Sequence, residues 1–217
     1  MSLLSFQKAL TDLIASPQLC LQVRAHPAET LSRYDLTPRE VTRLKTVVHQ
    51  QGMSVSCTLY RVNRITPIYT MLPYTCLLLG PALIPLAEEF WEICNKSDLQ
   101  FKREITLFGD FLLQQITTGS LQNPYLGEIV AMELAINELK FLPRTALLNA
   151  PVNEEGLHPL IRLVPFDHEP EPLLIELSRM QIPPFTAGTG EYFLVIDHRE
   201  EELSFSTLPR KTGAVAL

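Results

Sequence analysis

The chain changes character near residue 142, and this change constrains its fold more than any other feature of the sequence. Before it, apolar residues recur at helical spacing. After it, nine prolines separate short runs rich in β-branched and aromatic residues. Helices gathered in one part of a chain and strands in another are typical of α+β folds. The sequence therefore predicts an α+β fold, with a bundle of short helices over residues 1–142 and a small antiparallel β-rich domain over residues 143–217.

Eight short helices are expected in the first part. The clearest start signal is Thr37-Pro38-Arg39-Glu40, because threonine and glutamate form a capping box around a proline suited to the first turn. Pro67 is expected to end the fifth helix, since proline removes a backbone donor and clashes with the preceding turn. The helices are expected at residues 3–15, 18–24, from Pro27, 37–52, 54–66, from Pro81, 103–116 and 124–141.

Four runs in the second part have the composition of strands. They are Leu160–Phe166, Leu173–Leu177, Tyr192–Asp197 and Leu203–Leu208. The polar segment His198-Arg199-Glu200-Glu201 is expected to be a hairpin loop, and Pro143–Asn153 is expected to be the linker between the two parts.

The stretch Ile65–Ala87 carries no charge over 23 residues, which is long enough to cross a bilayer as a helix. It is interrupted by Pro67, Pro73, Gly80, Pro81 and Pro85. Prolines at this density break the continuous helix that lipid requires. We therefore expect two or three short buried helices joined by tight turns, and no membrane span.

The four cysteines form no CxxC pair, and none has a histidine at the spacing of a metal site. Most lie in apolar or helical stretches, where a free thiol behaves as a small hydrophobic group. They are Cys20, Cys57, Cys76 and Cys94. Reduced core cysteines, together with the absence of a signal peptide at the start of the sequence, predict a cytoplasmic location.

The sequence contains no complete catalytic or metal-binding constellation. The five histidines are scattered, and no phosphate-binding glycine loop is present. We expect no metal, no cofactor and no catalytic residue, and we predict that the protein is not an enzyme. Asp167-His168-Glu169 is interpreted as the polarity of a surface loop. Glu133, on an otherwise apolar helix, is expected to have a structural role, either paired with an arginine or at an exposed edge.

Charge is distributed unevenly along the chain. Residues 1–70 hold 8 Lys/Arg and 4 Asp/Glu, a net charge of +4, whereas residues 71–217 hold 10 and 20, a net charge of −10. The basic part, with Leu36-Thr37-Pro38-Arg39-Glu40 as a possible first helix of a helix-turn-helix, makes a DNA-binding transcriptional regulator the alternative function. Four excess charges are few for a DNA-binding surface, and Pro67 is expected to cut the helix that would read DNA. Nucleic acid is therefore the less favoured partner.

A set of motifs in fixed order resembles one bacterial family. The motifs are Leu59-Tyr60-Arg61-Val62-Asn63, Leu72-Pro73, Leu78-Leu79-Gly80, Leu86-Ala87-Glu88-Glu89-Phe90, Phe108-Gly109-Asp110-Phe111-Leu112 and Asn123-Pro124-Tyr125-Leu126-Gly127-Glu128-Ile129, followed by Glu133 and Ala135. Over residues 55–141 this order is similar to the HvfC/MbnC-like partner-protein family, also labelled as a putative DNA-binding domain. Residues 6–48 are similar to the small helical domain of Nif11-type leader peptides and LigA-type subunits.

The resemblance implies a specific role. Family members are partner subunits of multinuclear non-heme iron enzymes, which are TIM barrels that modify ribosomally made peptides. The partner itself carries no iron, and it presents the leader segment of the precursor peptide. The expected function is therefore that of a non-catalytic partner subunit, which binds the iron enzyme and the precursor peptide.

Two surfaces are the candidates for these contacts. The polar, basic helix face at Tyr60, Arg61, Asn63 and Arg64 is the candidate for the enzyme, although Tyr60 and Asn63 could equally cap or pack locally. An extended peptide can join a sheet as an added strand. The candidate edges are Tyr192–Asp197 and Leu203–Leu208, with the peptide-binding residues Tyr192, Leu194, Ile196, Leu203 and Phe205. The sequence does not indicate which edge is open.

Overall fold

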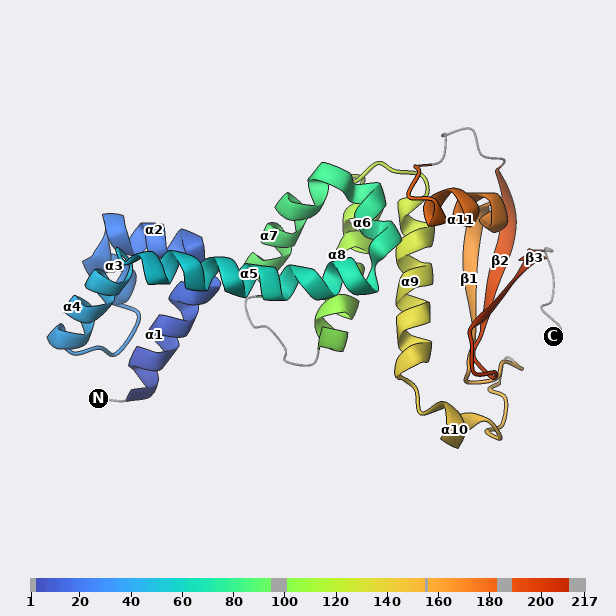
Figure 1. The fold of residues 1–217 in the computed structure, drawn as a ribbon, viewed down its shortest axis with the longest axis horizontal. Coiled ribbons are helices and arrows are strands. Elements are labelled where there is room, and N and C mark those ends of the chain that lie inside the picture. Colours follow the sequence, from blue (N-terminus) through green and yellow to red (C-terminus); the bar gives the residue numbers. More distant parts are fainter. Residues whose placement is uncertain (1–2, 95–100, 155, 183–188, 211–217) are drawn as a thin grey trace. The chain divides into compact units, whose positions relative to one another are not determined.

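The computed structural model describes residues 3–94, 101–154, 156–182 and 189–210 (Figure 1). Helices precede a three-stranded antiparallel sheet, which confirms the α+β fold class. The chain forms two compact units, Met1–Thr66 and Pro67–Leu217. This division falls inside helix α5 (Gln51–Met71), far from the domain boundary expected after residue 142. The β-rich region therefore shares its compact unit with several of the preceding helices.

The first unit contains α1 (Leu3–Ala15), α2 (Pro17–Ala25), α3 (Pro27–Leu31), α4 (Pro38–Val47) and the first part of α5. The helices expected over residues 3–15, over 18–24 and from Pro27 are confirmed. Apolar side chains from all five helices form its core, because each short helix buries one stripe against its neighbours. The buried members are Ala9, Leu13, Leu19, Cys20, Val23, Leu31, Tyr34, Leu44, Val48, Met53 and Cys57.

The capping box at the start of α4 is present. The backbone N–H of Glu40 donates to Thr37 Oγ1 at 3.2 Å, and the backbone N–H of Thr37 donates to Glu40 Oε2 at 2.7 Å. The helix ends at Val47 rather than at Gly52, and Gly52 lies inside α5. The expected C-terminal boundary was wrong because the chain turns at residues 48–50 without needing a glycine.

Replacing Thr37 with alanine is expected to destabilise the first unit by about 1 kcal/mol, because α4 loses the side-chain acceptor at its N-terminus. Thr46→Ala is the matched control, since the Thr46 hydroxyl is exposed and bonds only to the Thr42 carbonyl in the preceding turn. Urea unfolding followed by circular dichroism measures both variants. Equal stability of the two variants would contradict a role of the cap.

Helix α5 continues through Pro67 to Met71, so the expected end at residue 66 was wrong. A proline inside a helix costs roughly 3 kcal/mol, because one backbone hydrogen bond is lost and the ring crowds the preceding turn. The turn that follows Pro67 carries Ile68, and the chain then reaches Leu72; both side chains are fully buried. Burial of these two side chains offsets the cost of the proline, which local propensity does not reveal.

The uncharged stretch folds as short helices, as expected. They are α6 (Pro73–Leu79), the 3₁₀ turn η1 (Gly80–Ala82) and α7 (Leu83–Ile93), followed by α8 (Phe101–Thr117) and α9 (Leu126–Phe141). Phe90, Phe108 and Phe111 pack together, with ring centroids 5.3–6.3 Å apart. Within the described ranges no single helix is long and apolar enough to cross a membrane, and the pair Gln51–Met71 and Pro73–Ile93 reaches that length only across a bend of 106°.

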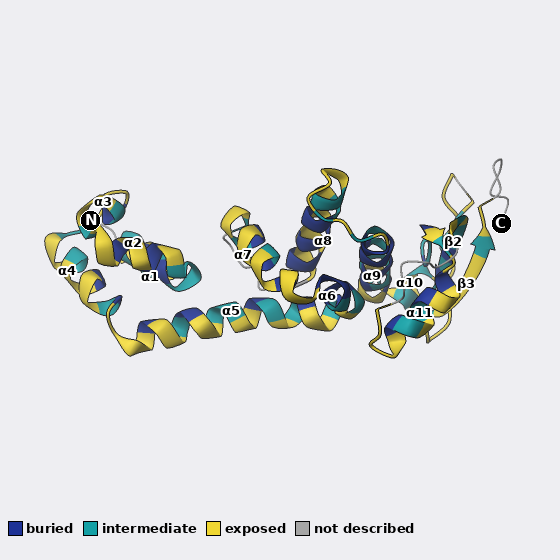
Figure 2. Ribbon diagram, turned by 90° about the horizontal axis from the view of Figure 1, so that it is seen from above, coloured by how far each residue is buried: buried dark blue, intermediate teal, exposed yellow. Residues whose placement is uncertain are grey.

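Helix α9 is the central element of the second unit (Figure 2). It packs against α8 on one side and against the sheet on the other. Apolar residues occur all around it rather than in one stripe, which is typical of a helix covered on more than one side. The close approach of α8 depends on Gly109, because a Cβ atom there would lie 2.6 Å from Leu134 Cδ1.

The sheet contains β1 (Ile161–His168), β2 (Thr189–Asp197) and β3 (Ser204–Pro209), in the order β1-β2-β3 and antiparallel throughout. Three of the four expected strands and the loop after Asp197 are confirmed. Leu173–Leu177 was expected to be a strand but belongs to helix α11 (Pro170–Ser178), where Leu173 and Leu177 lie one helical turn apart and are both buried. The expected linker includes a short helix, α10 (Arg144–Leu147).

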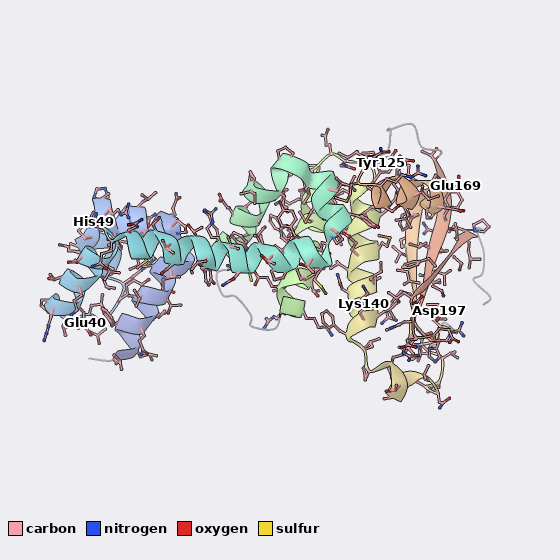
Figure 3. All side chains as sticks on the ribbon, viewed as in Figure 1. Glu40, His49, Tyr125, Lys140, Glu169 and Asp197 are labelled. Atoms are coloured by element: carbon pink, nitrogen blue, oxygen red, sulfur yellow. The ribbon has the colours of Figure 1, made fainter. Side chains whose placement is uncertain are left out.

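Cross-strand pairing defines the two faces of the sheet. Val164 pairs with Leu194 and Arg162 pairs with Ile196, so these side chains share one face. Val164, Phe166, Leu194 and Ile196 are buried on this face, and α9 packs on the sheet there. Figure 3 shows Tyr125 and Glu169 at one end of this layer and Lys140 and Asp197 at the other end.

Candidate functional site

Strand β2 is the central strand of the sheet, with β1 on one side and β3 on the other. Its backbone groups are paired along both sides over Tyr192–Asp197. The expectation that this segment is an open edge was therefore wrong. Leu194 and Ile196, two of the expected peptide-binding residues, are buried in the core, and Tyr192 is half-buried. Only the edge that contains β3 remains of the two candidates.

One hydrogen bond establishes which backbone groups of β3 point away from the sheet. The N–H of Arg210 donates to the carbonyl of Glu191 at 2.8 Å, so these two residues form a hydrogen-bonded pair. Hydrogen-bonded and non-hydrogen-bonded pairs alternate along an antiparallel ladder. With Ile196 paired to Phe205 and Leu194 paired to Thr207, the N–H and C=O groups of Phe205 and Thr207 therefore point outward.

The outer edge of β3 is open over two successive outward-facing residues. In the described part of the chain no group bonds to the outward N–H or C=O of Phe205 or Thr207. Pro209 is the third outward-facing position, and it has no N–H to offer. A proline at this place limits uncontrolled pairing at an edge strand and leaves a short ladder with a defined end.

The outer edge of β1 is blocked at most positions. The N–H of Ile161 donates to the His158 carbonyl at 2.9 Å, and the Arg162 guanidinium donates to the Ile161 carbonyl at 2.8 Å. The N–H of Asp167 donates to Glu128 Oε1 at 3.2 Å. Two outward-facing residues lie between them: Pro165 has no N–H, and only Leu163 keeps an outward N–H and C=O. An added strand would therefore meet a broken ladder on β1 and a continuous one on β3.

The side chains along the open edge form a mixed surface. Phe205 is 49% exposed, which is unusual for an aromatic residue in a strand, and it shares a face with the buried Ile196 beside it. Leu203, just before the strand, is half-buried. Of the five expected peptide-binding residues, the structure brings Leu203 and Phe205 to this edge.

The expected enzyme-binding face is not a single exposed surface. Arg64 is 2% exposed, and its guanidinium carbon lies 5.7 Å from the centre of the Tyr60 ring. Tyr60 and Arg61 are half-buried, and Asn63 is exposed. Arg64 was expected at the surface because the polar and basic residues were assigned to the outer face of the helix. Instead the apolar residues Val55, Leu59 and Val62 are about half exposed, and Arg64 is buried.

Glu133 has no arginine partner among the described residues and is not exposed, so both expected placements were wrong although its contacts are structural. It is 3% exposed, and its two carboxylate oxygens accept the backbone N–H groups of Tyr74 and Thr75 at 2.8 and 2.9 Å. These N–H groups belong to the first turn of α6, where helix donors have no intrahelical partner. Burial raises the pKa of the Glu133 carboxyl to about 7. Glu133 therefore attaches α6 to α9.

A second buried carboxylate attaches α9 to β1, and sequence reasoning missed it. Glu128 Oε1 lies 2.6 Å from His168 Nδ1, and the Tyr125 ring packs edge-on against the His168 ring at 4.6 Å. His168 was interpreted as part of a polar surface loop, but only 12% of its side chain is exposed. Burial raises the pKa of the Glu128 carboxyl, while the bond to His168 opposes this rise. The only signal in the sequence was the acidic residue in an otherwise apolar helix start.

Glu128, Glu133 and Glu138 therefore each make a different structural contact in the second unit. Glu138 forms an ion pair with Arg162 at 2.7 Å.

A groove of about 340 Å³ between α8 and α9 is lined mainly by apolar side chains, with Lys102 and Glu138 among its polar members. No group of three or more His, Cys, Asp or Glu side chains in the described ranges could hold a metal ion. The feature best suited to function is the open edge of β3.

Comparison with known proteins provides no family assignment. No family model matches the chain, and no curated protein matches its sequence.

Proposed function

We propose that this chain is a non-catalytic, cytoplasmic partner subunit. It captures an extended segment of a ribosomally made precursor peptide and presents it to an iron-dependent TIM-barrel enzyme that modifies the peptide. The observation that carries the proposal is the outer edge of β3, where Phe205 and Thr207 hold their backbone groups toward solvent. The ordered motifs over residues 55–141 support the role of enzyme partner.

Capture by strand addition follows from the chemistry of this edge. A peptide residue opposite Phe205 and another opposite Thr207 would each exchange two backbone hydrogen bonds with β3. Backbone bonds supply affinity without regard to sequence, and the exposed Phe205 ring adds apolar contact that a complementary side chain can fill. The bound segment would extend an existing three-stranded sheet as a fourth strand beside β3.

Replacing Thr207 with proline tests the proposal. Proline removes the outward N–H and leaves the bonds between β2 and β3 intact, because the neighbouring Ser206 and Leu208 make those bonds. We expect the affinity of a decapeptide selected from a random display library against the wild-type chain to fall at least about tenfold, since a buried donor–acceptor pair is lost. Fluorescence anisotropy measures the change.

Thr207→Val is the matched control, because valine is β-branched, favours a strand and keeps the N–H. It should bind within about twofold of the wild type. Circular dichroism of both variants verifies that the sheet forms. Failure to select any decapeptide, or equal binding by Thr207→Pro and Thr207→Val, would reject peptide capture at this edge.

The role of enzyme partner needs its own experiment. A TIM-barrel iron enzyme encoded beside the gene should co-purify with the wild-type chain at stoichiometric yield, and all iron should remain with the enzyme. The matched comparison is the same enzyme expressed without the chain and passed over the same resin. Equal recovery of the enzyme from both columns would reject the partnership.

A DNA-binding regulator is the second candidate, and one observation favours it. Arg39, Arg43 and Lys45 on α4 are all exposed, within the basic first unit. In addition, α5 continues through Pro67, so the expected helix end at this proline no longer counts against a DNA-recognition helix. A gel-shift titration at 50 and 200 mM salt tests this function, because phosphate contacts make affinity fall steeply with salt. Weak binding that is insensitive to salt would dismiss it.

A further inference from the structure

The two ends of the open edge of β3 differ in charge. Glu200, Glu201 and Glu202 are consecutive and exposed in the loop between β2 and β3, and Leu203 separates them from β3. Arg210 follows the strand at the other end, with its guanidinium carbon 5.4 Å from the centre of the Phe193 ring. A segment lying along this edge therefore passes from an acidic end to a basic end.

One cation lies near the acidic end, because the charge of Arg199 interacts with that of Glu200. Arg199 is the neighbouring base, and it is engaged by Asp197 in an ion pair of 2.6 Å. Arg144 reaches the same loop, where it donates to the Arg199 carbonyl at 3.0 Å rather than to a carboxylate. Among the described residues, no ion pair involves the three glutamates. Their charges are available to a ligand.

Pro209 sets where the added ladder stops. It has no N–H, so an added strand cannot extend its regular bonding past the basic end of β3. The opposite direction carries no proline: β3 begins at Ser204, and Leu203 lies between it and the glutamates. A bound segment therefore continues from Thr207 past Phe205 toward the glutamates.

We propose, on the basis of the peptide capture proposed above, that the ligand is a cationic segment that runs antiparallel to β3. Antiparallel ladders are slightly more stable per residue than parallel ones. In this orientation the C-terminal end of the ligand reaches the glutamates. The recognised pattern is an apolar residue opposite Phe205, followed about three to five residues later by lysine or arginine near the loop that carries Glu200, Glu201 and Glu202.

Three synthetic decapeptides test this pattern. They share a central segment of alternating valine and threonine, and they carry three lysines after it, three lysines before it, or three glutamates after it. We expect the peptide with lysines after the segment to bind the wild-type chain about tenfold more tightly than the glutamate peptide and about threefold more tightly than the peptide with lysines first, as several exposed ion pairs allow. Raising salt to 0.5 M should reduce both differences.

The triple variant Glu200→Gln, Glu201→Gln, Glu202→Gln is the second arm, and in it the three peptides should bind within about twofold of one another. Thr207→Pro should weaken all three peptides equally. Equal binding of the three peptides to the wild type, with all three weakened by Thr207→Pro, overturns the charge pattern and leaves peptide capture intact. A preference among the peptides that is absent from the wild type but present in the triple variant would also overturn the charge pattern. An absence of binding by all three peptides, or no effect of Thr207→Pro, overturns both proposals.

Discussion

Phe166→Ala is expected to lower the free energy of unfolding of the second unit by about 3–5 kcal/mol, and to expose α9 together with the sheet. The Phe166 side chain is fully buried on the sheet face that α9 covers, so its removal leaves a cavity between the two layers. Urea denaturation gives the loss of stability. Hydrogen exchange over residues 126–141 shows whether the helix opens with the strands.

Ser206→Ala is the control for this experiment, because Ser206 is an exposed residue of the same sheet. Its effect on stability should stay within about 0.5 kcal/mol. The informative comparison is the protection of α9 amides in Phe166→Ala. If these amides stay protected while β1 exchanges freely, the sheet is an independent domain that begins after residue 142, and the compact unit that starts at Pro67 is not cooperative.

The fold class could be predicted because periodicity reports local structure directly. The 3.6-residue period of residues 3–15 and the alternation around Phe205 are each visible without knowledge of the partner segments. The position of the compact units could not be predicted in the same way. Helix α9 has apolar residues on every side, and a periodic pattern does not say which elements cover them. The covering sheet contributes residues such as Phe166, far along the chain.

The polar residues of α9 explain why the compact unit that starts at Pro67 continues across the change in composition near residue 142. Glu128 bonds to His168 and to the backbone of Asp167, while Glu133 bonds to the first turn of α6. Each contact joins α9 to a distant segment. A carboxylate in an apolar helix indicates that it has a polar partner elsewhere in the fold. Three of the four donors here are backbone N–H groups, which every residue type except proline carries, so the sequence does not identify them.

The candidate site was only partly predictable, and prolines were the neglected signal. Proline within a strand marks an edge, because the missing donor must face away from the ladder. Pro165 lies in β1 and Pro209 ends β3, whereas β2 contains none. These three facts place Tyr192–Asp197 in the centre of the sheet. The preference for the β3 edge over the β1 edge required coordinates, since it depends on the contacts of Ile161 and Asp167.

Glu133 should make the stability of the second unit fall as pH rises from about 5 to about 7.5. Burial raises the pKa of its carboxyl from 4.5 to about 7, although the N–H groups of Tyr74 and Thr75 favour the charged form. The folded chain then binds the proton more tightly than the unfolded chain does. Its stabilising contribution is complete below about pH 4.5 and is lost as pH rises through 7, by about 3 kcal/mol in all.

Glu133→Gln removes this titration and should flatten the dependence between pH 5 and pH 7.5 by about that amount. The variant also starts from a lower stability, by about 1–3 kcal/mol, because an amide can accept only one of the two backbone donors in place of two oxygens. The test therefore compares the slope of the unfolding free energy against pH, rather than the stability at any one pH. Urea denaturation at six pH values measures it.

Glu138→Gln is the matched control on the same helix. The hydrogen bond from Arg162 lowers the pKa of the Glu138 carboxyl, so its titration lies below this pH window and the slope should be unchanged. The pair formed by Glu128 and His168 contributes equally to all three proteins. Equal slopes in the wild type and in Glu133→Gln would mean that Glu133 stays ionised at pH 5. In that case the two donors at the start of α6 outweigh burial, and α6 is attached to α9 through a permanent buried charge.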